Sequence, residues 1–228
     1  MNAGRTARER ARAELTEEIK VEARRQLTTV GAEALSLRAV SRELGMVSSA
    51  LYRYFRSRDD LLTALIIDAY DALGEAAEAA AGGDDLLEEW LAIYRAVRSW
   101  ARTCPQEYAL IYGSPISGYK APQTTVAPAT RVPLLLLDLL RRAQASGRLA
   151  VPPDAPTPTG VLAQQAQVLV ELAPEVPTAV LVRTIIVWTQ LFGMISFELF
   201  GQLVGSMDPA DEFFDSASRQ MAAFIGLR

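Results

Sequence analysis

The chain has 228 residues, of which 50% are hydrophobic and 22% are charged, and its formal net charge is −4. This length and apolar content suffice for one or two domains with a buried core and argue against a disordered chain. The absence of histidine excludes histidine-activated nucleophiles and His-ligated metal sites, and the single cysteine, Cys104, excludes zinc fingers and internal disulfides.

Positive charge gathers at the start of the chain. Residues 1–60 hold 12 Lys and Arg against 9 Asp and Glu, whereas residues 61–228 hold 11 against 18. A basic N-terminal part on an acidic remainder is typical of a DNA-binding head on a non-binding body, although ordinary solvated helix faces give a similar imbalance. The N-terminus is rich in Arg and Glu, so no secretory signal is expected, and the single cysteine fits a cytoplasmic protein.

The first predicted helix begins near Thr6, which forms a possible capping box with Glu9. Gly31 is expected to end this helix. The residues of its apolar face are Leu15, Ile19, Ala23, Leu27 and Val30. The basic residues at its start are Arg5, Arg8, Arg10 and Arg12. They form either an arm that reaches DNA or a solvated helix start.

Residues 37–55, LRAVSRELGMVSSALYRYF, predict two short helices joined by a tight turn. Leu37, Val40 and Leu44 recur at helical spacing, Ser36 is a plausible N-cap, and Gly45 can end the helix in a left-handed conformation. The expected buried side of the second helix consists of Ala50, Leu51, Tyr54 and Phe55. The residues expected to face outward are Ser48, Ser49, Tyr52 and Arg53. This arrangement places the second helix in a DNA major groove.

The run LYRYF followed by SRDDLL resembles the DNA-binding end of the tetracycline-repressor (TetR) family of bacterial regulators, and the resemblance covers roughly residues 15–70. It implies that three N-terminal helices form the DNA-binding unit and that Leu61 and Leu62 open a fourth helix. Many relatives carry a capping Ser or Thr where this chain has Val47, so capping is expected to pass to Ser48. We accordingly expect a helix-turn-helix head over residues 1–58 and a regulatory, ligand-binding and dimerisation body over residues 59–228.

The residues expected to touch DNA fall into two groups. Those placed to meet phosphates are Arg38, Tyr52, Tyr54 and Arg58. Those placed to meet base edges are Ser48, Ser49 and Arg53, of which Arg53 can bond a guanine through two donors. For Tyr54, core packing with the hydroxyl at the rim is an equal alternative.

The rest of the chain also has helical patterning. Further helices are expected over residues 59–81, from Asp84 or Asp85 to 103, over 105–113, 134–145 and 178–204, and after the turn at Asp208 and Pro209. Residues 114–133 are expected to form a loop, and residues 152–158, with four prolines, a connector. No alternating pattern typical of strands is present, so the predicted fold class is all-α.

The segment 178–204 is apolar on more than one face, as expected of a helix that packs both on a core and on a second surface. TetR relatives dimerise through a four-helix bundle of their last two long helices, and a two-fold dimer would also double the DNA contacts. The expected interface residues are Ile186, Gly193, Phe197, Phe200, Val204, Phe213 and Met221. The alternative is that both helices only complete the monomer core. The uncharged run of residues 184–197 is too short to span a membrane.

TetR-like bodies usually enclose a small-molecule pocket, and this chain offers a mostly apolar lining with few polar groups. The expected lining residues are Trp100, Tyr108, Tyr112, Gln164, Gln167, Trp188, Thr189 and Phe192. Such a pocket favours an apolar effector, whereas the same aromatic residues at helical spacing are also typical of plain core. No cofactor and no metal are expected.

These patterns predict a homodimeric, ligand-responsive transcriptional regulator that binds palindromic double-stranded DNA, most simply a repressor released by an apolar effector. The alternative is a helical small-molecule-binding protein whose DNA head has fallen out of use. No catalytic constellation can be assembled from these residues, so an enzyme is not expected.

Overall fold

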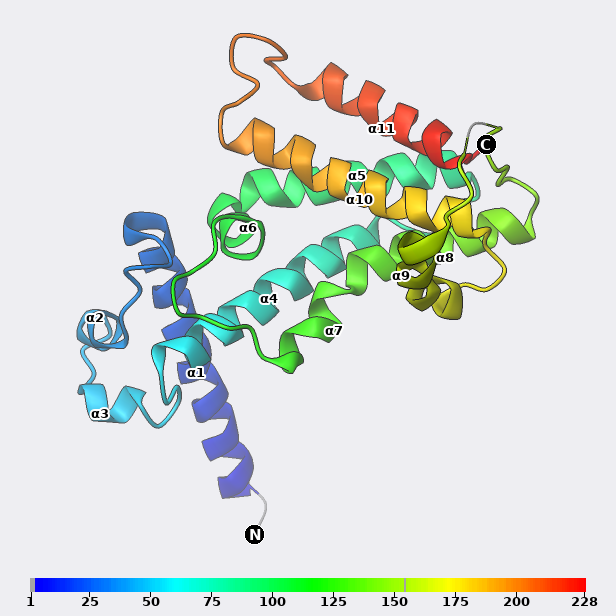
Figure 1. Ribbon diagram of the computed structural model, residues 1–228. Helices are drawn as coiled ribbons and strands as arrows, with labels where there is room; N and C mark the ends of the chain where they lie inside the picture. The colour runs from blue at the N-terminus through cyan, green and yellow to red at the C-terminus, as the bar shows by residue number, and fades with distance from the viewer. Residues whose placement is uncertain (1–2, 154) are drawn as a thin grey trace. The chain divides into compact units, whose positions relative to one another are not determined.

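The computed structural model describes residues 3–153 and 155–228 (Figure 1). Within this range the regular elements are helices, and the only extended pairing is an isolated antiparallel bridge between Leu149 and Leu227. The predicted all-α class is therefore confirmed. The chain forms two compact units, and α4 (Arg58–Ala79) belongs to both.

The N-terminal unit comprises residues 1–71 and 104–129, and the C-terminal unit comprises residues 72–103 and 130–228. The N-terminal unit therefore holds more than the expected head, because a later segment packs within it. The expected domain boundary at residue 58 remains a prediction.

The N-terminal unit is built around an apolar core between its helices. These helices are α1 (Ala3–Val30), α2 (Leu37–Glu43), α3 (Ser48–Leu51), the first part of α4, α6 (Pro105–Tyr112), the 3-10 turn η1 (Gln123–Thr125) and α7 (Val126–Ala129). The buried core residues are Ile19, Ala23, Leu27, Leu35, Leu37, Val40, Leu51, Phe55, Leu61, Leu62 and Leu65. Each large apolar side chain buried in this way stabilises the unit by about 1.5–3 kcal/mol.

Two expectations for α1 were wrong. The helix already includes Ala3, so Thr6 lies inside it and is not a capping residue. The carbonyl of Thr6 instead accepts a hydrogen bond from Arg10 Nε at 3.3 Å. Val30 is 53% exposed because it ends the helix beyond the buried part of the apolar face. The predicted end of the helix is confirmed, since Gly31 follows with a φ of +73°.

The C-terminal unit packs five helices and the second part of α4. The helices are α5 (Leu86–Thr103), α8 (Arg131–Ala145), α9 (Gly160–Leu172), α10 (Thr178–Leu199) and α11 (Asp211–Ile225). The two largest buried rings of α5 bridge to the last two helices. Trp90 Nε1 donates to the carbonyl of Ser218 at 3.2 Å, and the Tyr94 hydroxyl donates to the carbonyl of Val187 at 3.3 Å. Burial raises the pKa of Tyr94 well above its ordinary value, so the hydroxyl remains a donor.

Partly buried ion pairs join helices within the C-terminal unit. Arg98 Nε and Nη2 donate to the Glu198 carboxylate, each at 2.7 Å, and Arg98 Nη1 donates to Asp211 at 2.9 Å. Arg142 binds Glu89, whose side chain is fully buried, through two donors. Burial of Glu89 opposes its ionisation, but hydrogen bonds from Arg142 and from the Gly82 backbone outweigh this effect and lower its pKa.

The C-terminal half differs from expectation in three places. Residues 114–133 are not wholly loop, because they contain η1, α7 and the start of α8. Helix α9 was not anticipated, since its three glutamines interrupt any apolar stripe. Helix α10 ends at Leu199 rather than at Val204, because Gly201 adopts a φ of +80° and turns the chain.

Helix α10 is long and apolar enough to cross a bilayer by length and composition alone, and half of its most apolar stretch is buried within the protein. It packs against α5, α9 and α11 and carries the buried Arg183. Arg183 Nη1 donates to the carbonyl of Phe224 in α11. These contacts are those of a core helix.

Candidate functional site

The segment from α2 to α3 forms the expected helix-turn-helix, with four residues between Glu43 and Ser48. Gly45 has a φ of +64°, and the amide of Met46 bonds the carbonyl of Ser41 at 2.8 Å, which reverses the chain after α2. Ser36 occupies the predicted N-cap position with an extended backbone, but its side chain makes no capping hydrogen bond. The position of this cap is confirmed and its hydrogen bond is not.

Capping of α3 differs from the sequence-based expectation. Val47 occupies the N-cap position, and its side chain is 70% exposed. The hydroxyl of Ser48 lies 3.1 Å from that of the buried Ser41, which donates to the carbonyl of Arg38. Because a hydroxyl has one proton, Ser48 donates to Ser41 in this arrangement. Ser48 therefore fastens α3 to α2 and does not cap α3.

The outward face of α3 carries polar side chains that the head does not use for its own structure. Ser49 on α3, Tyr52 and Arg53 directly after its end, and Arg38 on α2 are exposed. In the described chain no hydrogen bond or ion pair engages these four side chains. They are free to meet phosphates or base edges, as their residue types suggest.

Arg58 and Tyr54, both expected at phosphates, have partners inside the unit. Arg58 donates to three backbone carbonyls in the turn after α1, from Nη2 to Ala32 at 2.7 Å and to Glu33 at 3.0 Å, and from Nε to Leu35 at 3.2 Å. Tyr54 is partly buried against the core of the unit. These contacts give both residues a structural role, and their contact with DNA remains a prediction.

Two residues of this surface have a contact or an exposure that the sequence reading did not anticipate. Arg12 of α1 contacts the turn that follows α3. Its Nη2 donates to the Arg53 carbonyl at 3.4 Å, and its guanidinium lies 5.6 Å from the centroid of the Tyr54 ring. No local spacing could reveal a contact across 41 residues. Val47 was read only as a missing cap, although its exposure at the start of α3 makes it a candidate for contact with a thymine methyl group.

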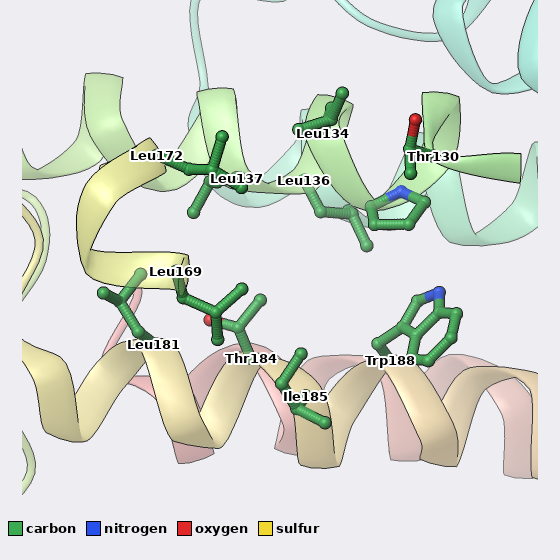
Figure 2. Close-up of a pocket in the computed structure, with 11 residues that line it drawn as sticks. Thr130, Leu134, Leu136, Leu137, Leu169, Leu172, Leu181, Thr184, Ile185 and Trp188 are labelled. Carbon is green, nitrogen blue, oxygen red and sulfur yellow. The ribbon is translucent and has the colours of Figure 1, made fainter. Parts of the chain in front are cut away.

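The C-terminal unit contains a cavity of about 220 Å³ between α8, α9 and α10 (Figure 2). Its lining residues are Thr130, Pro133, Leu134, Leu136, Leu137, Leu169, Leu172, Leu181, Thr184, Ile185 and Trp188. The lining is almost wholly hydrocarbon and includes no charged side chain. Of the eight residues predicted from sequence to line a pocket, Trp188 alone lines this cavity.

The other seven predicted pocket residues are dispersed. Gln164, Gln167 and Thr189 are exposed, while Trp100 on α5 is half-buried. Phe192 is buried with its ring edge-on to that of Trp188, at 5.9 Å between centroids.

Tyr108 and Tyr112 belong to the N-terminal unit, where their ring centroids lie 5.3 Å apart. Burial raises the pKa of Tyr112 far above its ordinary value. The sequence reading missed the leucines of α8, because their spacing is the same whether they face a core or a cavity.

Comparison with known proteins identifies the family. The family model for bacterial regulatory proteins of the tetR family matches residues 19–65, and the model for the tetracyclin repressor-like C-terminal domain matches residues 90–221. The HTH-type transcriptional regulator Rv1816 of Mycobacterium tuberculosis is 40% identical over 228 residues, covering 97% of this chain and 94% of its own length. The chain belongs to the TetR family. It is a helix-turn-helix transcriptional regulator, as its curated relatives are named.

Solved structures agree with this assignment. The crystal structure of SCO4313 superposes with a TM-score of 0.75 at 34% identity, covering 94% of this chain and 98% of that chain. The TetR-family regulator PfmR from Thermus thermophilus shares the fold, with a TM-score of 0.58 at 22% identity over 91% of this chain and 96% of that chain. The N-terminal TetR match spans all seven residues expected at DNA, and the C-terminal match spans the whole cavity lining.

In this TetR-family chain, the residues expected at a dimer interface lie on α10, on the turn that follows it and on α11. Ile186, Phe197, Phe200 and Val204 are exposed, while Gly193, Phe213 and Met221 are half-buried. Four bulky apolar side chains exposed on one helix and its following turn are unusual for a surface that meets only water.

Proposed function

We propose that this TetR-family regulator is a homodimer that reads a palindromic operator through α3 and represses transcription until an effector binds its C-terminal unit. The observation that carries the proposal is the outward surface of α3 and the turn that follows it, where the side chains of Ser49, Tyr52 and Arg53 are exposed and unused by the fold. A head preserved in this form argues against a disused DNA-binding unit.

Within this proposal, base edges are read by Arg53, Ser49 and Val47. Arg53 has two donors for a guanine, Ser49 a hydroxyl, and Val47 a hydrocarbon group for a thymine methyl. Arg38 and Tyr52 meet phosphates and set the register of the helix on DNA. Ser48 acts indirectly and does not itself contact DNA, since it holds α3 against α2.

Dimerisation is supported by the exposed apolar side chains of α10 and its following turn, Ile186, Phe197, Phe200 and Val204. Burying them in a second copy would remove apolar surface from water at about 25 cal/mol per Å². A two-fold dimer also presents two α3 helices to the two halves of a palindrome.

The effector response is supported by the apolar cavity of the C-terminal unit. Since its lining has no charged side chain, the effector is an apolar molecule. A regulator of this kind works in the cytoplasm, where the operator is, and its role is regulatory rather than catalytic.

The test is selection of bound duplexes from a random pool, followed by fluorescence anisotropy of the enriched duplex and a scrambled duplex at two salt concentrations. We expect a palindromic sequence, saturation at two protomers per duplex, and a preference for the enriched duplex that persists at the higher salt concentration. Equal binding to both duplexes that disappears in salt would contradict the proposal, because it indicates phosphate contact without readout.

A further inference from the structure

The cavity of the C-terminal unit contains few polar groups. Thr130, Thr184 and Trp188 are the only lining residues whose side chains carry a polar atom. The hydroxyl of Thr184 already donates to the carbonyl of Val180 at 2.9 Å, within its own helix. Among these three side chains, the indole of Trp188 is the one with a buried polar atom that finds no partner in the described part of the chain.

The indole nitrogen of Trp188 is buried, and among the described residues it finds no hydrogen-bond acceptor. Figure 2 shows this nitrogen on the side of the ring that faces α8, across the cavity from Leu136 and Thr130. The same unit shows how a buried indole is ordinarily satisfied, since Trp90 Nε1 donates to the carbonyl of Ser218 at 3.2 Å. A buried donor without an acceptor costs free energy, so an acceptor brought by a ligand would be favoured at Trp188 once the side chains that cover the nitrogen shift on binding.

The cavity has an apolar mouth. Leu134, Leu172 and Ile185 line it and are also 45%, 49% and 43% exposed, respectively. A hydrocarbon molecule can therefore pass from solvent into the cavity along apolar side chains, and a chain longer than the cavity can extend over them.

The size of the cavity limits the part of the ligand that it encloses. A dry cavity of about 150 Å³ lined by apolar residues accommodates benzene. At about 220 Å³, this cavity has room for a six-membered ring and a short substituent. A charged group inside would lose its hydration without a counter-ion, because no charged side chain lines the site.

We propose that this cavity binds an uncharged, mostly hydrocarbon ligand whose one hydrogen-bond acceptor, a carbonyl or ether oxygen, accepts the proton of Trp188 Nε1. The inference names the effector class of the proposed regulator and rests on that function only for the effect of the ligand on DNA binding. Binding itself is a property of the C-terminal unit and can be measured without DNA.

The test uses two probes of matched shape, butyrophenone with a ketone oxygen and n-butylbenzene without one, titrated into the full-length protein by calorimetry. We expect butyrophenone to bind about 3- to 10-fold more tightly, as one net hydrogen bond provides. A second measurement is the ¹H–¹⁵N spectrum of protein labelled at tryptophan, which carries three indole signals. Butyrophenone should move the Trp188 signal to lower field, and n-butylbenzene should not.

A matched pair of variants separates the hydrogen bond from general packing. Trp188→Phe removes the donor and keeps an aromatic ring, so the preference for butyrophenone should fall to about 1-fold, that is, no preference. Trp100→Phe, which changes an indole outside the cavity, should keep the full preference. The anion 4-phenylbutyrate should fail to saturate the protein at concentrations at which butyrophenone does.

The proposal is overturned if wild type binds the two uncharged probes equally, if Trp188→Phe keeps the preference, or if 4-phenylbutyrate binds as tightly as the ketone. Because these results come from the unmodified protein as well as from variants, poor folding of one variant does not decide the outcome. Ketone binding together with failure to select an operator would leave this inference standing and contradict the proposed function. Selection of an operator together with failure to bind the ketone would support the proposed function and contradict this inference.

Discussion

The N-terminal and C-terminal units use their polar side chains in opposite ways. Arg53 and Ser49, at and just after α3, are directed to solvent and unused by the fold, whereas in the C-terminal unit Arg98 and Arg142 are bound by the carboxylates of Glu198 and Glu89. The described residues that line the cavity include no charged side chain. A surface that binds DNA bases needs side-chain donors that are free of other partners. A cavity for an apolar molecule needs helices that ion pairs outside the cavity hold in place. Substitutions should therefore alter DNA binding in one unit and stability in the other.

The largest effect is expected for Arg98→Ala in the C-terminal unit. It removes the nearer of the two arginines that Glu198 and Asp211 share and should lower the free energy of unfolding by about 2–3 kcal/mol, less than the about 3–5 kcal/mol of a fully buried pair. Urea denaturation measures this. Arg102→Ala, an exposed neighbour on the same carboxylates, is the control and should cost less than about 1 kcal/mol. Equal losses would contradict a special role for Arg98.

Arg53→Ala tests the opposite side of the comparison. It should leave stability within about 0.5 kcal/mol, because the side chain is exposed. It should weaken operator binding by about 1–3 kcal/mol and relax preference at one or two base pairs. Fluorescence anisotropy with single-base variants of the operator measures both the affinity and the base preference. A uniform loss on every duplex would make Arg53 a phosphate contact instead.

Arg58→Ala decides between two roles for one residue. Loss of the three hydrogen bonds that Arg58 donates to backbone carbonyls should lower the free energy of unfolding by about 1–2 kcal/mol. If Arg58 also binds a phosphate, the slope of log affinity against log salt should become shallower by about 1. A destabilised variant with an unchanged salt slope would assign Arg58 to the fold alone, and Arg38→Ala, an exposed arginine of α2, is the control for a phosphate contact.

Val47→Ala should have a smaller effect, confined to sequence preference. Removing two methyl groups at the exposed start of α3 should cost about 1 kcal/mol at a thymine and nothing at the other bases, because a methyl contact is worth about as much as a buried CH₂. Binding to operators with uracil in place of thymine measures this. A wild-type affinity that is the same for thymine and uracil would contradict the contact.

The smallest effect, present at neutral pH and lost in acid, concerns the Glu89–Arg142 pair. Because the pKa of Glu89 is lowered in the folded protein, its contribution to stability is present above its ordinary value of 4.5 and is lost as the pH falls through the folded value. Glu89→Gln should remove this part of the pH dependence. Urea midpoints of wild type and variant between about pH 7 and pH 3 provide the measurement, and parallel curves would contradict it.

Within the head, most of the architecture was readable from local pattern. The spacing of Leu37 and Val40, the glycine at 45 and the apolar pair Leu51 and Phe55 predicted the helices, the turn and their buried sides, and the structure agrees. These features are local because a helix period and a left-handed turn are properties of a few consecutive residues. The sequence could not reveal that Ser48 would bond Ser41 instead of capping α3.

The amino-acid sequence by itself determined that the chain is all-α, that α2 and α3 form a helix-turn-helix, and that Ser49, Tyr52 and Arg53 face outward. Tertiary structure alone decided which groups meet across distance: Arg58 with carbonyls 23–26 residues earlier, Arg12 with the end of α3, and the leucines of α8 with Trp188 around a cavity. The physical reason is that periodicity shows which face of a helix is apolar but not what covers it. Whether that face meets a filled core or a cavity depends on how closely helices distant in the chain can pack.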